Sequence, residues 1–87
     1  MPYIDKNRRP AFEVEVPDLN GLPSVTPGDL NYLITKICLA YLKRKGTSYT
    51  FLNDVIGVLE CAKLEMYRRV CAPYEDEKCD LNGDVYA

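Results

Sequence analysis

Length, composition and charge place this chain among small folded proteins and disfavour several functional classes. It has 87 residues, of which 47% are hydrophobic and 28% are charged, enough for one domain near the lower size limit for folding alone. No apolar run approaches the ~20 residues that cross a bilayer, and the first residues lack the apolar stretch of a signal peptide. We therefore expect a cytoplasmic protein without membrane contact. The net charge of −2 also argues against nucleic acid as a partner.

The cysteines and the absence of histidine argue against a metal centre and against the commonest forms of catalysis. The four cysteines are Cys38, Cys61, Cys71 and Cys79. No two of them have the close spacing of zinc ligands, and histidine, the usual companion ligand, is missing. Without histidine the chain also lacks the usual general base and any Ser-His-Asp triad. We expect no metal, no cofactor and no enzymatic activity, and cysteines that behave as small apolar residues.

The first 27 residues are predicted to form an extended, proline-rich arm. Its prolines are Pro2, Pro10, Pro17, Pro23 and Pro27. Each ring fixes φ and removes a backbone donor, so a long helix is not expected here. Phe12–Val16 alternates apolar and charged residues, as a short strand or an extended edge segment does. Because one strand cannot form a sheet alone, we favour an irregular arm whose apolar side chains cover a helical core.

Residues 28–87 are predicted to form an all-α domain with main helices at about 28–45 and 49–71. Thr26 is a typical N-cap for the first helix, because Pro27 follows it at the first helical position. Gly46 is a typical C-cap after three cations. These signals predict where the first helix begins and ends.

The second predicted helix carries a long apolar stripe. Its members are Leu52, Val55, Leu59, Ala62, Met66 and Val70. This spacing places them on one helix face, which suits an antiparallel partner, so we expect the two helices to form an antiparallel hairpin. Pro73 predicts a kink or an end near Cys71, with a continuation of the helix over 73–81.

The first predicted helix is apolar around nearly its whole circumference. Between Leu30 and Leu42 the apolar residues extend well beyond the single stripe of a surface helix. A helix of this kind is buried on more than one side. In a chain this short, a second subunit supplies the other side most easily, so we expect a homo-oligomer.

Tyrosines and cations occur together on both predicted helices. The candidate ligand-binding residues are Tyr32, Lys36, Lys63, Tyr67, Arg68, Arg69 and Tyr74. Tyrosine stacks on bases, and lysine and arginine hold phosphates, so a cleft between subunits lined by these residues suits a small nucleotide-like anion. The alternative is that the tyrosines seal helix contacts and the charged residues form a solvated face.

The acidic residues leave a metal-dependent nucleotide hydrolase as a further alternative. Helical pyrophosphatases bind magnesium through acids one turn apart on facing helices. In this chain Glu60 and Glu65 lie five residues apart, which is about 140° around the helix axis, and the first helix supplies only Asp29. The pattern therefore departs from that arrangement.

Four stretches resemble a family of small uncharacterised proteins of phages, prophages and bacterial genomes. They read LNYLIT at 30–35, IGVLECAKLEMYRR at 56–69, APYED at 72–76 and NGDVY at 82–86. The chain departs from that family's pattern in the arm, where FEVEV at 12–16 replaces a more helix-like segment. The resemblance implies a phage or prophage accessory protein and no established activity.

Three functional hypotheses remain open at this point. The first is a non-enzymatic oligomer that binds a small anionic, nucleotide-like ligand, by analogy with phage sponges that sequester cyclic nucleotide signals of bacterial defence. The second is a protein–protein interaction or inhibitor module directed at a host protein. The third is the metal-dependent hydrolase.

Overall fold

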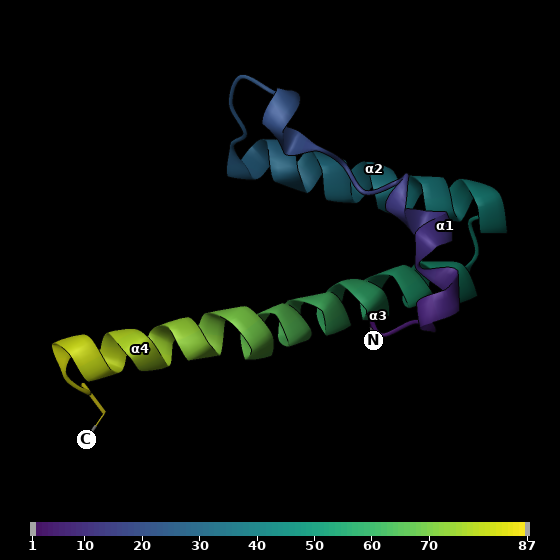
Figure 1. The fold of residues 1–87 in the computed structure, drawn as a ribbon. Helices are drawn as coiled ribbons and strands as arrows, with labels where there is room; N and C mark the ends of the chain where they lie inside the picture. The colour runs from purple at the N-terminus through teal and green to yellow at the C-terminus, as the bar shows by residue number, and fades with distance from the viewer. Residues whose placement is uncertain (1, 87) are drawn as a thin grey trace. The chain divides into compact units, whose positions relative to one another are not determined.

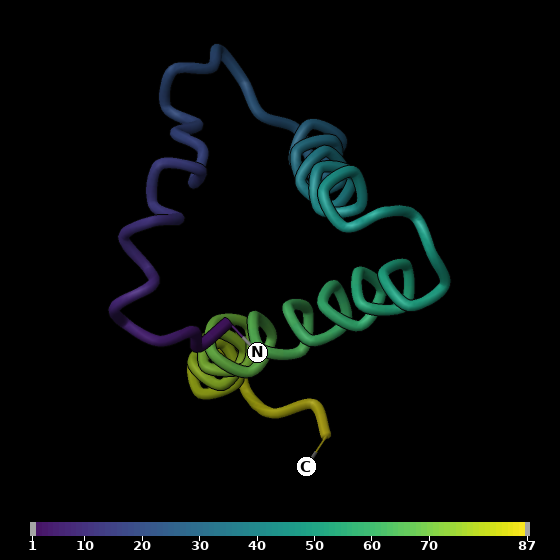
Figure 2. Tube along the Cα trace, turned by 90° about the vertical axis from the view of Figure 1, so that its right-hand side faces the viewer, coloured from purple at the N-terminus to yellow at the C-terminus, as the bar shows by residue number. Residues whose placement is uncertain are grey.

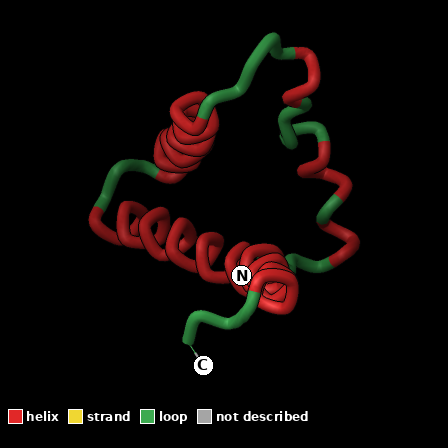
Figure 3. The backbone as a smooth tube through the Cα atoms, turned by 90° about the vertical axis from the view of Figure 1, so that its left-hand side faces the viewer, coloured by secondary structure: helices red, strands yellow, loops and turns green. Residues whose placement is uncertain are grey.

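The computed structural model describes residues 2–86, which divide into two compact units. One unit spans Tyr3–Val55, and the other runs from Ile56 towards the C-terminus and includes Pro2. The boundary between them lies inside helix α3 (Figure 1). Every regular element in the described range is helical, which confirms the all-α prediction (Figure 3).

The arm contains short helical turns. A 3₁₀ turn at Lys6–Arg8 is followed by α1 at Pro10–Glu13 and by a second 3₁₀ turn at Leu19–Gly21. The expectation of a strand-like, extended segment at Phe12–Val16 is therefore wrong. Local pairing explains the difference, because the backbone N–H groups at the end of α1 donate to carbonyls three residues earlier, whereas a lone strand would leave them without partners.

Helix α2 spans Pro27–Lys45 and is capped at both ends. The Asp29 backbone N–H donates to Thr26 Oγ1 at 3.2 Å, and the Thr26 N–H donates to Asp29 Oδ2 at 2.9 Å. This reciprocal pair satisfies two donors that the first turn of a helix leaves unpaired. At the other end Gly46 adopts a φ of 99° and its N–H donates to the Leu42 carbonyl at 2.7 Å.

The N-terminal cap gives a direct stability prediction. Thr26→Ala is expected to lower the free energy of unfolding by about 1 kcal/mol, because it removes the acceptor for the Asp29 N–H. Thr35→Ala is the matched control on the same helix. Thr35 lies inside α2 and donates only to the Asn31 carbonyl and side chain, so its replacement should keep or raise stability. Urea unfolding of both variants measures the difference, and equal losses would contradict the capping role.

A small core lies where α2 meets the beginning of α3, which spans Tyr49–Met66. The link 46–48 joins the two helices (Figure 2), and Ser48 Oγ accepts from the Phe51 N–H at 3.4 Å. The Tyr41 and Phe51 rings pack edge to face with centroids 6.4 Å apart. Leu42, at 9% exposed, is the one buried hydrophobic side chain of the described residues. The core of this unit is therefore confined to the helix–helix link.

Helix α3 continues into a π-helical turn at Tyr67–Cys71 and then into α4 at Ala72–Asn82 (Figure 1). Pro73 has no N–H to donate and its ring crowds the carbonyl four residues earlier. The wider π turn absorbs this, because the Ala72 N–H donates to the Tyr67 carbonyl five residues back. The helix therefore does not end near Cys71. It runs on until Gly83, with a φ of 93°, caps α4 through the Cys79 carbonyl.

Away from the small core, both units expose large apolar side chains. In the N-terminal unit they include Leu30, Ile34, Ile37 and Leu39 of α2, and in the other unit Ile56, Val58, Met66 and Val70. Among the helices of residues 2–86, none combines the length and the apolar character needed to cross a membrane.

Candidate functional site

Two of the predicted ligand residues lie on α2 in the N-terminal unit. Tyr32 and Lys36 are one helical turn apart, and Lys36 Nζ lies 5.9 Å from the centroid of the Tyr32 ring. This is a cation–π contact between two exposed side chains. It presents an aromatic face and a positive charge at the same point of the helix surface, which are the two groups that a base and a phosphate require.

The other five predicted residues belong to the C-terminal unit. Lys63 lies in the last turn of α3 and Tyr74 in the first turn of α4, while the π turn carries the remaining three, Tyr67, Arg68 and Arg69. All five are exposed. The predicted ligand residues are therefore distributed over both units, two in the N-terminal unit and five in the other.

Two of these cations form ion pairs with acids on their own helix. Lys63 Nζ lies 3.2 Å from Glu60 Oε2, with both side chains well exposed. Arg68 donates through both Nη2 and Nε to the Glu65 carboxylate. The Glu65 side chain is only 15% exposed, so this second pair sits in a less solvated environment than the first. A ligand anion would compete with these carboxylates for the same cations.

Lys78 is a residue that the sequence reasoning missed. Its Nζ lies 5.5 Å from the centroid of the Tyr74 ring, which reproduces the Tyr32–Lys36 arrangement on another helix. The signal was present in the sequence, because both pairs place a tyrosine four residues before a lysine. Attention to that spacing would have identified it.

The helix surface separates the members of the C-terminal group. Lys63 and Tyr67 are four residues apart and share one face, whereas Arg68 and Arg69 occupy successive positions that turn away from it. Within each unit the structure therefore brings together tyrosine–lysine and acid–base pairs. Lys63 and the two arginines present their charges at different points of the helix surface, and binding of an anion by them remains a prediction.

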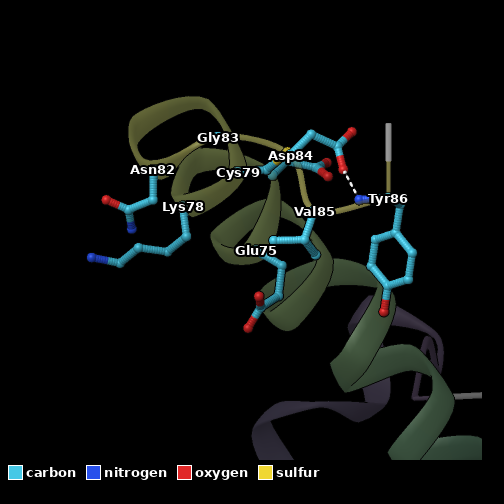
Figure 4. A pocket seen from close by; sticks show the side chains of 9 residues that line it. Glu75, Lys78, Cys79, Asn82, Gly83, Asp84, Val85 and Tyr86 are labelled. Carbon is cyan, nitrogen blue, oxygen red and sulfur yellow. Dashed lines mark hydrogen bonds between the residues drawn. The ribbon is translucent and has the colours of Figure 1, made fainter.

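One hollow lies at the end of α4, where the tail turns back along the helix (Figure 4). It has a volume of about 450 Å³, and its charged lining residues are Glu75, Asp76, Lys78 and Asp84. Within the tail, the Tyr86 N–H donates to Asp84 Oδ1 at 2.7 Å. The three carboxylates outnumber the single lysine, and the predicted ligand residues do not line it. This hollow does not suit the anion that the sequence suggested.

The described residues offer no evident metal site. Across residues 2–86, no group of three or more cysteine, aspartate or glutamate side chains is arranged to hold an ion. All four cysteines are free thiols, with Cys61 and Cys71 exposed and Cys38 and Cys79 half-buried. The described residues supply ion pairs, cation–π contacts and exposed apolar side chains.

Comparison with known proteins identifies one family. The family model described as Domain of unknown function (DUF6899) matches residues 1–85 of the chain. No curated protein and no solved structure matches. The resemblance to a family of small uncharacterised proteins is thereby supported at the level of family membership.

Proposed function

This chain belongs to the DUF6899 family, whose description names no activity, and we propose from its residues that it is a non-enzymatic helical protein that works by binding, as a homo-oligomer. The proposal has a single principal support, which is the amount of apolar surface that the helices leave uncovered. Ion pairing and aromatic stacking along the helices add sites for a ligand or a partner.

The exposed area carries this proposal. In the N-terminal unit, large apolar side chains of α2 are 42–59% exposed, namely Leu30, Ile34, Ile37 and Leu39. In the other unit, large apolar side chains are 58–66% exposed, namely Ile56, Val58, Met66 and Val70. Contiguous exposed apolar side chains of this kind mark interaction surfaces.

The proposal also covers how the helices and the copies are arranged and where the protein works. In it α2 and α3 form the antiparallel hairpin that the sequence predicts, and copies of the hairpin associate through the remaining apolar faces. The free cysteines support a cytoplasmic location, because reducing compartments keep thiols unpaired. The phage or prophage setting rests on the sequence resemblance, and from it follows a role in counter-defence by analogy.

Sedimentation velocity over a range of protein concentrations tests the proposed self-association. We expect a species larger than one chain that dissociates on dilution. A single compact monomer at every concentration would overturn the proposal. The exposed faces would then favour the alternative of an interaction or inhibitor module that docks on another protein.

A small nucleotide-like anion is a second candidate partner. Two observations favour it: Lys36 stacks on the exposed Tyr32 ring, and Arg69 is exposed beside Arg68 in the π turn. Calorimetry with a panel of nucleotides and cyclic dinucleotides tests it. Lys36→Gln and Arg69→Gln should weaken any binding at least about tenfold, because each removes a charge-assisted contact, whereas Lys43→Gln serves as the control. No heat with any compound would contradict this candidate while leaving self-association intact.

A further inference from the structure

We propose that the segment from Leu59 to Leu81 forms a parallel coiled coil with the same segment of a second copy. This inference rests on the proposed self-association and deepens it, because it names the surface, the partner and the orientation. Four observations support it. They are the spacing of apolar residues along one continuous helix, the position of the π turn, the lengths of the helices and the charges beside the apolar row.

A heptad repeat runs along the helix from α3 to α4. Leu52, Leu59 and Met66 are seven residues apart, Tyr74 follows after eight, and Leu81 after seven more. We call these five residues the seam. Such a row, with three intervals of seven residues and one of eight, is typical of a coiled coil, in which the side chains insert between those of a facing helix.

The single eight-residue interval coincides with the π turn. A π turn closes its hydrogen bond over five residues instead of four, so it holds one more residue than an α turn. The π turn at Tyr67–Cys71 lies between Met66 and Tyr74, the two seam residues that are eight apart. In a regular α-helix the eighth residue would point about 80° away from the seam. The π turn removes that offset and returns Tyr74 and Leu81 to the face of Met66.

A second row accompanies the seam with the same irregularity. Val55 and Ala62 are seven residues apart, Val70 follows after eight, and Glu77 after seven. These residues occupy the other core position of the heptad, three or four residues from the seam. The row is apolar except at Glu77, near the end of α4, where a charged side chain lowers the stability of a coiled coil. Both rows place the extra residue in the π turn.

The chain's own first helix is too short to cover this whole face. At 1.5 Å per residue α2 is about 28 Å long, whereas the helix from Tyr49 to Asn82 is about 50 Å long. A helix of the length of α2 therefore covers little more than half of the longer one. Met66, Val70, Tyr74 and Leu81 are all exposed in the unit to which they belong.

The apolar face of this helix becomes narrower towards its C-terminal end, which is the part that α2 is too short to cover. Near the start, Ile56 and Val58 flank the seam and make it broad enough to pack on two sides. Further along, charged residues flank it, and the apolar row becomes as narrow as a two-stranded coiled coil requires. The broad part suits a helical bundle with α2, and the narrow part suits a single partner helix.

The flanking charges select a second copy in parallel orientation. Lys63 and Lys78 lie on one side of the seam, and Glu65 and Asp80 lie on the other. In a parallel pair the two unlike flanks face each other across the interface, so the acidic side of each copy meets the basic side of its partner. In an antiparallel pair lysines would face lysines and acids would face acids. The surface is thus complementary to itself in one orientation only.

Two matched substitutions test the surface. Met66 and Leu64 lie on the same helix with nearly equal exposure, 60% and 58%, but only Met66 belongs to the seam. Met66→Glu should weaken self-association at least about tenfold, because it buries a charge in the interface, while Leu64→Glu should leave it unchanged. Sedimentation measures association, and circular dichroism verifies that both variants keep their helix content. Equal effects of the two variants would overturn the assignment of the seam.

Disulfide trapping tests the orientation and the occupant together. In a variant whose four natural cysteines are replaced, Leu59→Cys and Met66→Cys should each form a covalent dimer on mild oxidation. Matching core positions of a parallel pair lie about 6 Å apart, within the range that a disulfide spans. Leu64→Cys is the control and should form no covalent dimer.

The outcomes separate this inference from the proposed function. A wild-type protein that is monomeric in sedimentation overturns both. A wild-type oligomer that Met66→Glu does not weaken, or that fails to trap with Leu59→Cys and Met66→Cys singly, overturns the parallel coiled coil and leaves the proposed self-association standing.

Discussion

Leu42→Ala is expected to lower the free energy of unfolding by about 2–3 kcal/mol, a large part of the stability of a domain this small. Leu42 is the one buried hydrophobic side chain of the described residues, and it lies beside the Tyr41–Phe51 contact that closes the link between α2 and α3. Truncation removes apolar contacts and leaves a cavity at the most deeply buried point of this unit.

Leu64→Ala is the matched control for this prediction. Leu64 is largely exposed and lies off the seam, so its truncation should cost well under 1 kcal/mol. Urea unfolding followed by circular dichroism measures both changes. Equal losses in the two variants would show that the link between α2 and α3 is not the principal core of the chain.

A one-residue change in helix register is expected to have the largest effect on self-association. Insertion of one alanine directly after Met66 rotates Tyr74 and Leu81 by about 100° relative to Leu59, so association should weaken at least about tenfold. The same insertion after Asp84, beyond the end of α4, is the control and should change nothing.

The reverse change should preserve association. Deletion of Arg69 combined with Pro73→Ala converts the eight-residue interval into a regular heptad and removes the residue that disfavours an α turn. The seam then continues in phase through an uninterrupted α-helix. Loss of association in this double variant, or its survival after the insertion at Met66, would contradict the role assigned to the π turn.

The ends of the main helices could be predicted from the sequence because capping is local chemistry. Thr26 with Asp29, Gly46 and Gly83 each act on backbone groups within a few residues. The side-chain or φ preference that identifies such a residue in a sequence also stabilises it in the structure. The all-α class follows for the same reason, since no segment within residues 2–86 has a partner strand.

The π turn and the helical turns of the arm could not be predicted from such local signals. Pro73 indicates that an α-helical hydrogen bond is missing. A kink, the end of the helix or an extra residue in a π turn can each accommodate the missing bond, and which of them occurs depends on neighbouring packing. In the arm, the alternation at Phe12–Val16 has the period of a strand. A strand needs a partner to satisfy its backbone, and one turn of helix at Pro10–Glu13 satisfies it locally.

The candidate ligand residues illustrate a further limit of prediction from sequence. Tyr32–Lys36 was predictable because the two side chains are one turn apart on a helix, and Tyr74–Lys78 follows the same rule. Bringing residues of α2 together with those of the π turn depends on contacts between helices and between copies. Residue spacing along one chain carries no information about such contacts, so the sequence could suggest candidate ligand residues but not the shape of a site.

Native mass spectrometry of the full chain purified from cells tests the central claim most directly, because it reports the number of copies and any retained small molecule together. We predict a principal species with the mass of two or more copies of the 9.9 kDa chain. A principal species with the mass of one chain, compact in its charge-state distribution and without a bound molecule, would contradict the account.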